Sequence, residues 1–314
     1  MKANIVIIGG GISGVSIAYN LAKKGMKDIV VLDDNYMTGG ATGRCGAGVR
    51  QQWKSKMNCI LAKKSVEFFE KAQEELGYHR DVEFKQEGYL IVATTKEEHE
   101  QFIKNVALQN SLGIPSKICT PKEAKKIVPH LNTKDVISAA FCNTDGHLNP
   151  FLMTDAYYVA AKRLGVTFFY KEKVLDIIVK DGKIDKVVTE NKEIYTNKVV
   201  NAAGSYAKEI GDLAGVDIPV YSENHQILVT EPIETTWLRI VTPTLCSRKA
   251  RATAPSATRA AVSRALARSR IGRASSKSYF CMPTKSACPG RGLVNGALRA
   301  RFFISSSGTG SADI

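Results

Sequence analysis

The stretch KANIVIIGGGISGVSIAYNLAKKGMKDIVVLDD, residues 2–34, decides the fold. Its apolar run at residues 5–8 suits a buried parallel strand, and Gly9, Gly11 and Gly14 follow at the spacing G-x-G-x-x-G. The first glycine permits a tight turn, the second lets a pyrophosphate approach the backbone, and the third lets a helix pack closely on the sheet. We therefore predict a unit that binds a dinucleotide at the N-terminus of its helix.

The second strand of this unit, residues 29–32, ends at an acidic residue. Asp33 lies 22 positions after Gly11, where a carboxylate accepts hydrogen bonds from the ribose hydroxyls of a bound dinucleotide. A glycine pattern alone also occurs in turns that bind nothing. The complete unit in register, with strand, turn, helix, strand and acid, favours a nucleotide site.

A second glycine cluster, GGATGRCGAGVRQQW at residues 39–53, follows almost directly. A plain NAD-binding domain usually continues into another ordinary helix at this point. A loop with this many glycines instead brings backbone N–H groups and the Arg44 guanidinium towards an extended cofactor. The second cluster, and not the first, therefore distinguishes the kind of dinucleotide.

This cluster resembles a segment of the D-amino-acid-oxidase-like family of FAD-dependent amine oxidoreductases. Within that family it is most similar to the beta subunits of sarcosine oxidase and L-proline dehydrogenase, which carry a similar G-x-T-x-R-x-G-x-G-x-R-Q-Q segment. The later segments that fit are QEGYLIVATTKEE (86–98), NTDGHLNP (143–150), VVNAAGSYAKEIGDLAG (199–215) and ENHQILVTEP (223–232). The resemblance covers about residues 3–234 and implies FAD as the cofactor.

The resemblance implies an α/β fold of two interleaved domains. A glutathione-reductase-like, FAD-binding Rossmann domain is expected at residues 1–82 and 150–217. An α+β substrate domain, truncated in this chain, is expected at residues 83–149 and 218–237. Residues 238–314 form a tail that the resemblance does not cover.

Apolar periodicity and turn residues predict the remaining elements. We expect helices at residues 57–76, from Thr95 onward, at 121–129 and at 151–164, and strands at 88–93, 139–142, 166–170, 174–179, 186–189, 193–196 and 199–201, with a hairpin turn at 180–183. The last strand should be parallel and deliver Ala202, Ala203 and Gly204 to the cofactor.

The glycine unit and the resemblance together predict the cofactor-binding residues. They are Gly9, Gly11, Ile12, Ser13, Gly14, Asp33, Asp34, Gly40, Ala41, Thr42, Arg44, Gly46, Gly48, Val174, Ala203 and Gly204. No cluster of His, Cys, Asp or Glu has the spacing of a metal site, so no metal is expected.

Two residues are candidates for the reaction itself. Oxidation of an amine by hydride transfer to a flavin needs a cation for the substrate carboxylate and a dry pocket, and Arg50 is the first candidate for that cation. A structural salt bridge and a contact to the cofactor remain alternatives for Arg50. His225 could line the substrate cavity or tune the flavin, and a polar residue satisfied between strands is the other interpretation.

The expected function is oxidation of the C–N bond of a small amino acid or N-methyl amino acid, of the sarcosine, glycine or proline type. Other subunits of a hetero-oligomeric oxidase or dehydrogenase are the expected partners, with no specific nucleic acid. A reductase using a nicotinamide cofactor is a weaker hypothesis, because the middle of the chain lacks a second G-x-G-x-x-G unit. An inactive truncated or frame-shifted flavoprotein fragment, whose basic tail binds anions without specificity, is the alternative.

The net charge of +14 comes almost entirely from the tail. Residues 1–237 hold 30 basic and 29 acidic residues, whereas residues 238–314 hold 14 basic residues and one acid. Arginine replaces lysine as the main basic residue in the same tail. Two interpretations of the tail stay open. It is a natural extension that binds nucleic acid or an acidic membrane, or it is a solvated linker. We favour a shift of reading frame, because it changes composition abruptly without regard to function.

Seven cysteines are scattered without a C-x-x-C pair, which is typical of reduced thiols in a cytoplasmic protein. The N-terminus has no secretory pattern, since its apolar run leads straight into the glycine turn. No stretch has the 18 apolar residues of a spanning helix. The sequence therefore predicts a cytoplasmic protein without a membrane span.

Overall fold

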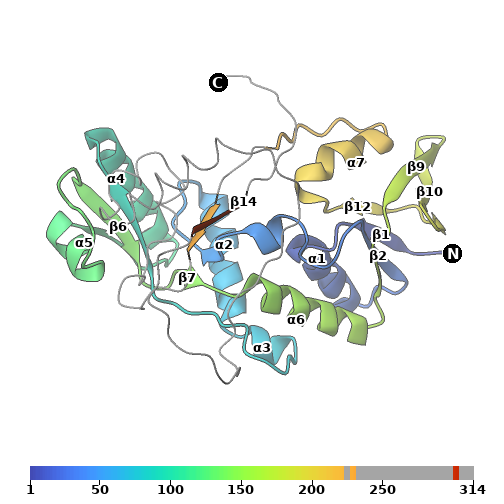
Figure 1. Cartoon of the computed structure of the whole chain (residues 1–314), viewed down its shortest axis with the longest axis horizontal. Coiled ribbons are helices and arrows are strands. Elements are labelled where there is room, and N and C mark those ends of the chain that lie inside the picture. Colours follow the sequence, from blue (N-terminus) through green and yellow to red (C-terminus); the bar gives the residue numbers. More distant parts are fainter. Residues whose placement is uncertain (223–226, 231–299, 304–314) are drawn as a thin grey trace. The chain divides into compact units, whose positions relative to one another are not determined.

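The structure is a computed structural model that describes residues 1–222, 227–230 and 300–303 (Figure 1). The chain forms two compact units. The first comprises Met1–Tyr89, Gln101–Lys117 and Phe141–Glu223, and the second comprises Leu90–Glu100, Ile118–Ala140 and the described residues after Glu223. These units group residues by proximity, and the division into cofactor and substrate domains remains a prediction.

The first unit is built on a parallel sheet with strand order β12-β1-β2-β8. The strands are β1 (Ile5–Ile8), β2 (Ile29–Asp33), β8 (Thr167–Tyr170) and β12 (Val199–Asn201). Adjacent parallel strands need a crossover connection, and the helices α1 (Ile12–Lys23) and α6 (Pro150–Arg163) provide it for β2 and β8. The predicted α/β fold with a Rossmann-type sheet is confirmed.

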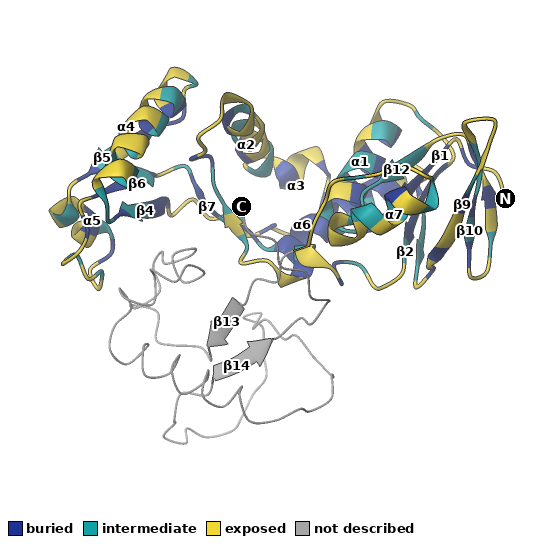
Figure 2. Ribbon diagram, turned by 90° about the horizontal axis from the view of Figure 1, so that it is seen from above, coloured by how far each residue is buried: buried dark blue, intermediate teal, exposed yellow. Residues whose placement is uncertain are grey.

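Both faces of this sheet are covered, which explains the unbroken apolar runs in β1 and β2. Alternate side chains of a strand point to opposite faces. Ile7 and Val31 therefore pack on the α1 and α6 side, whereas Val6 and Leu32 pack on the other side. All of β1 and all of β2 except Asp33 are buried, and Figure 2 is coloured by this burial.

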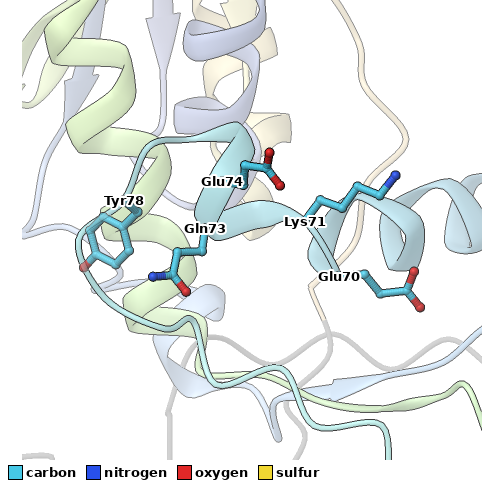
Figure 3. Close-up of a pocket in the computed structure, with 5 residues that line it drawn as sticks. All are labelled: Glu70, Lys71, Gln73, Glu74 and Tyr78. Atoms are coloured by element: carbon cyan, nitrogen blue, oxygen red, sulfur yellow. The ribbon is translucent and has the colours of Figure 1, made fainter.

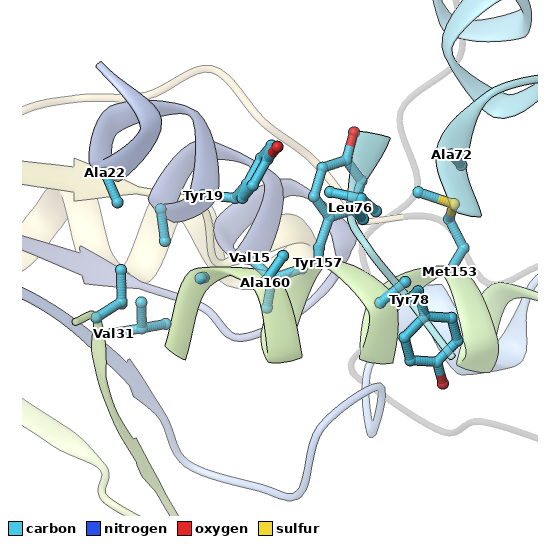
Figure 4. Packing of buried hydrophobic residues seen from close by; sticks show 14 of the residues in the cluster. Val15, Tyr19, Ala22, Val31, Ala72, Leu76, Tyr78, Met153, Tyr157 and Ala160 are labelled. Carbon is cyan, nitrogen blue, oxygen red and sulfur yellow. The ribbon is translucent and has the colours of Figure 1, made fainter. Parts of the chain in front are cut away.

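Helices α1 and α6 pack directly against each other. Figure 4 shows Val15 and Tyr19 of α1 facing Ala160 and Tyr157 of α6. The Tyr19 and Tyr157 rings meet edge to face with centroids 5.6 Å apart, a favourable geometry for aromatic pairs. Because Ala160 is small and fully buried, the two helices can approach closely over the sheet.

An antiparallel meander covers the opposite face of the sheet. It consists of β9 (Val174–Lys180), β10 (Lys183–Thr189) and β11 (Glu193–Tyr195). Asp181 and Gly182 form the two-residue loop between β9 and β10 with φ angles of 49° and 70°, as a type I′ hairpin turn requires. The predicted hairpin turn at residues 180–183 is confirmed, although β10 begins three residues earlier than the sequence predicts.

The remaining elements complete the two units. Three groups of strands remain: β3 (Gly48–Val49) paired antiparallel with β7 (Gly146–His147), the sheet β4-β6-β5 (Tyr89–Ala93, Ser138–Cys142 and Ser116–Cys119), and the antiparallel pair β13 (Ile227–Thr230) and β14 (Ala300–Phe303). The remaining helices are α2 (Lys56–Phe69), α3 (Ala72–Glu75), α4 (Lys96–Ser111), α5 (Pro121–Ile127) and α7 (Ala207–Leu213). Two 3₁₀ turns, η1 (Ala41–Arg44) and η2 (Gly204–Tyr206), complete the set. Among the helices of the described residues, none is both long and apolar enough to cross a membrane.

The predicted helix at residues 57–76 is wrong in its extent, because α2 ends at Phe69 and the short helix α3 follows. Lys71 leaves the helical region with φ −116° and ψ 7°. The break turns Ala72 and Leu76 into the core, where both are fully buried. No glycine or proline marks this position, so the periodicity alone could not reveal it.

A buried carboxylate joins the sheet to the meander. Glu172, between β8 and β9, accepts hydrogen bonds from the Thr189 hydroxyl (2.5 Å), the Lys192 ammonium (3.0 Å) and the Asn191 backbone N–H (3.1 Å). Its side chain is 6% exposed. These donors, the Thr189 hydroxyl first, lower the pKa of Glu172 to about 2.

We expect Glu172→Gln to lower the free energy of unfolding by about 2 kcal/mol at pH 7, because the charged acceptor is lost. When the pKa of a carboxyl is lower in the folded than in the unfolded chain, the carboxyl stabilises the folded chain at any pH above its unfolded pKa. This stabilisation is lost as the pH falls towards the folded pKa. The difference from wild type should therefore shrink between pH 4.5 and pH 2. Thermal unfolding followed by circular dichroism measures it.

Glu190→Gln is the matched control, because Glu190 is an exposed glutamate on the same turn. Its unfolding temperature should stay close to wild type at each pH. A Glu172→Gln deficit that is the same at pH 7 and at the acid end would contradict the assignment.

Candidate functional site

The glycine turn holds the end of β1 against the start of α1 and the end of β12. Gly9 has a φ of 111°, and a Cβ there would overlap the carbonyl oxygen of Ala202. A Cβ on Gly14 would overlap the carbonyl oxygen of Gly9. Ala202 is held in place because its N–H donates to the Ile8 carbonyl at 2.8 Å. Side chains are thus excluded from the turn by its own backbone.

The N-terminus of α1 leaves backbone donors without protein acceptors. Gly11 is its N-cap and offers no side chain for capping. The Ile12 N–H donates to the Thr42 hydroxyl at 3.1 Å, but the N–H groups of Gly11 and Ser13 meet no acceptor within the described part of the chain. Such free N–H groups at the positive end of a helix dipole form a site for an anion.

The acid at the end of β2 also supports the turn. Asp33 accepts a hydrogen bond from the Gly10 N–H at 2.6 Å and another from the Asn35 N–H at 2.8 Å. Burial raises the pKa of this carboxyl above its ordinary value, and the neighbouring Asp34 adds a smaller effect in the same direction. The carboxylate keeps lone pairs for further donors, such as ribose hydroxyls.

Gly10 of the turn and Tyr170 of β8 were missed by the sequence reasoning. A Cβ on Gly10 would lie 2.7 Å from the Tyr170 ring and 3.2 Å from Asp33. Tyr170 reaches this position because it pairs with Asp33 in the register of β2 and β8. The only signal in the sequence was the unbroken run of three glycines, whose middle member lies outside the G-x-G-x-x-G pattern.

The second glycine loop meets the first at Thr42, in the turn η1. The Thr42 hydroxyl accepts from Ile12 and lies 3.0 Å from where a Gly11 Cβ would be. At Gly40 and Gly46 an added Cβ would meet no atom within 4 Å. Packing within the described residues therefore does not account for these two glycines, and both leave room for a ligand.

The other predicted cofactor residues differ in their surroundings. A Cβ on Gly48 would lie 3.2 Å from the Tyr89 ring, so packing within the chain accounts for that glycine. Val174 packs in the core on the meander side, together with Ala203. The remaining predicted residues, Asp34, Ala41, Arg44 and Gly204, are exposed. The role of each in binding a cofactor remains a prediction.

Arg50 lies over aromatic rings at the end of the glycine loop. Its guanidinium carbon is 4.2 Å from the centroid of the Trp53 ring and 5.9 Å from that of Tyr89. The Trp53 indole N–H donates to the Arg50 carbonyl at 2.9 Å, which keeps the ring beside the cation. No carboxylate of the described residues forms an ion pair with Arg50, so the salt-bridge alternative gains no support there.

Other predicted or observed features are not assigned to these two groups. His225 and the predicted tail, except Ala300–Phe303, lie outside the described residues. A hollow of about 490 Å³ is lined by Glu70, Lys71, Gln73, Glu74 and Tyr78, and Figure 3 shows these five side chains. It shares no residue with the glycine turn or with the Arg50 group, and we do not assign it to the site. Within the described ranges no three His, Cys, Asp or Glu side chains are grouped to hold a metal ion.

The profile of the family DAO, described as FAD dependent oxidoreductase, matches residues 4–259 of the chain. The match thus extends beyond about residue 234, where the resemblance read from the sequence was expected to end. Its start coincides with the first strand of the glycine unit.

Curated relatives and solved structures agree with this match. Dimethylglycine dehydrogenase, mitochondrial, from Rattus norvegicus is 34% identical over 234 residues, which are 74% of this chain and 27% of the relative. Sarcosine oxidase subunit beta from Arthrobacter sp. is 28% identical over 237 residues, 74% of this chain and 58% of the relative. The crystal structure of L-proline dehydrogenase from P. horikoshii has a TM-score of 0.70 at 38% identity, covering 76% of this chain and 63% of that chain. The chain therefore spans about a quarter of the length of the first relative.

We expect Gly14→Ala to destabilise the folded chain on the order of 3 kcal/mol, because its Cβ would overlap the Gly9 carbonyl and force α1 away from β1. Thermal unfolding of the chain without added cofactor measures this. Gly46→Ala is the control, since a Cβ there meets open space, and it should melt as wild type does. Equal unfolding temperatures for the two variants would contradict the packing described here.

Proposed function

The chain belongs to the family of FAD-dependent oxidoreductases, and from this premise we propose that it oxidises the C–N bond of a small amino acid or N-methyl amino acid. FAD is the cofactor, and when bound it supplies the hydride acceptor for this chemistry. The observation that carries the proposal is the Arg50 guanidinium, which lies over two aromatic rings without an ion-pair partner among the described carboxylates.

The glycine turn fits the cofactor. We propose that the diphosphate of FAD binds at the N-terminus of α1, where Gly11 and Ser13 offer free N–H groups. The carboxylate of Asp33 would accept from the ribose hydroxyls. The open sides of Gly40 and Gly46 would admit the extended cofactor past the second loop. Support comes from the backbone packing at Gly9 and Gly14, which leaves no side chain between the helix end and the ligand.

The names of the relatives support the substrate class. Dimethylglycine, sarcosine and proline, which appear in the names of three similar proteins, each combine a carboxylate with an alkylated amine. A guanidinium binds a carboxylate with two parallel hydrogen bonds, and no described carboxylate pairs with the Arg50 guanidinium. Arg50 would hold the carboxylate while the Trp53 and Tyr89 rings limit the access of water to the cation. His225 remains a proposed second residue of the substrate site.

Two wider expectations are also proposals. Other subunits as partners are supported by the similarity to a protein named as a beta subunit. A cytoplasmic location is supported by Cys59 and Cys142, which are buried thiols without a disulfide bond, as is usual in a reducing compartment.

We expect Asp33→Ala to weaken FAD binding by about tenfold or more, because it removes the ribose acceptor and the brace of the Gly10 N–H. Quenching of flavin fluorescence during titration with the protein gives the dissociation constant. Asp135→Ala, which removes an exposed aspartate of the second unit, is the control and should bind FAD as wild type does. An unchanged affinity in Asp33→Ala would remove Asp33 from the site.

The proposed reaction is tested by adding substrates to the FAD-loaded chain without oxygen and following the loss of flavin absorbance. Proline, sarcosine, dimethylglycine and glycine form the panel. Arg50→Ala should lower kcat/KM for the best of them on the order of 100-fold, through the lost charged hydrogen bonds. The exposed Arg80→Ala is the matched control. A flavin-loaded wild type that no member of the panel reduces would contradict the proposed function.

A further inference from the structure

Asp145 carries a buried carboxylate that the proposed reaction does not use. It lies between β6 and β7, in the segment Thr144-Asp145-Gly146-His147, and is fully buried. Oδ1 accepts from the Gln51 backbone N–H at 2.9 Å and from the Gln51 side-chain amide at 3.2 Å. Oδ2 accepts from the Gln52 side-chain amide at 3.0 Å. No lysine or arginine of the described residues pairs with it.

The turn that presents Asp145 is itself fixed on both sides. The Asp145 carbonyl accepts from the Gly88 N–H at 2.9 Å, and His147 and Lys85 exchange two backbone hydrogen bonds. A Cβ on Gly146 would overlap the Lys85 carbonyl oxygen, so the two segments are in close contact. The carboxylate therefore has a fixed position against which the glutamines are held.

The same network fixes the surroundings of Arg50. Arg50 directly precedes Gln51, whose backbone N–H and side chain are both bound to Asp145. Gln52 also donates to the Tyr89 carbonyl at 2.9 Å, and the Tyr89 ring is one of the two beside the guanidinium. Both the backbone that carries the cation and one ring beside it are thus tied to one carboxylate.

We propose that Asp145 is the positioning residue for Arg50, and that its carboxylate holds the guanidinium where it binds the carboxylate of an amino acid. This inference rests on the proposed function. A carboxylate suits the role because three donors converge on it, and an asparagine would replace one acceptor with a competing donor. Burying a charge without a partner cation adds little to stability, because removing the carboxylate from water costs free energy. When several donors bind such a carboxylate, however, their positions are held firmly relative to it.

A double-mutant cycle tests the proposal, with acetate as the probe and calorimetry of the FAD-loaded full-length chain as the measurement. Asp145→Asn should raise the Kd for acetate about tenfold or more. Arg50→Ala should raise it at least as much. The double variant should bind acetate no more weakly than Arg50→Ala, because a residue that acts only through Arg50 has no effect once Arg50 is absent.

Glu172→Gln is the matched control, since it also converts a buried carboxylate that accepts several hydrogen bonds into an amide. It should lose stability and keep the acetate affinity of wild type. Gln51→Met is a milder variant that keeps the backbone donor, and it decides the question if Asp145→Asn does not fold. It should raise the Kd several-fold, and again only where Arg50 is present.

Additive effects of Asp145→Asn and Arg50→Ala, or a wild-type Kd in Asp145→Asn or in Gln51→Met, would overturn the proposal. A wild type that does not bind acetate would overturn it as well, because Arg50 would then not be a carboxylate site. A wild type that binds acetate with the expected cycle but oxidises no amino acid would refute the proposed reaction and leave the positioning role of Asp145 standing.

Discussion

The close approach of α1 to the end of β1 is the constraint on which the rest of the structure depends. α1 can begin at the edge of the sheet only if Gly14 lies against the Gly9 carbonyl, and this contact leaves no room for a Cβ. This contact fixes the N-terminus of the helix, with its free N–H groups, next to Gly10, whose own N–H is bound to Asp33. The buried strands and the packing of α1 on α6 then hold that geometry, because moving the helix would open both the core and the turn.

The loop of residues 39–53 connects the two groups of polar residues in the site. At one end Thr42 binds the first turn of α1, and at the other end Gln51 and Gln52 bind the buried Asp145. The loop is therefore tied at both ends and can carry Arg50 at a set position relative to the glycine turn. A ligand that binds this loop loses little binding free energy to ordering it, because contacts within the protein already hold both ends of the loop.

The sequence predicted those parts of the fold whose cause is local. The glycine spacing, the two buried strands, the hairpin turn at Asp181 and Gly182, and the helix start at Thr95, whose hydroxyl accepts from the Glu98 N–H, all follow from residues near one another in the chain. The break between α2 and α3, the contact of Tyr170 with Gly10, and the bonds of Asp145 to the glutamines depend on residues brought together only by tertiary packing. Periodicity and spacing cannot reveal such contacts.

If the glycine turn of this chain holds FAD, the visible absorption spectrum of the purified chain will show it. The chain is incubated with FAD, separated from free cofactor by gel filtration, and its flavin absorption compared with its protein content. We expect about one flavin per folded chain. A chain that is folded by circular dichroism yet leaves the column colourless after this incubation would contradict it.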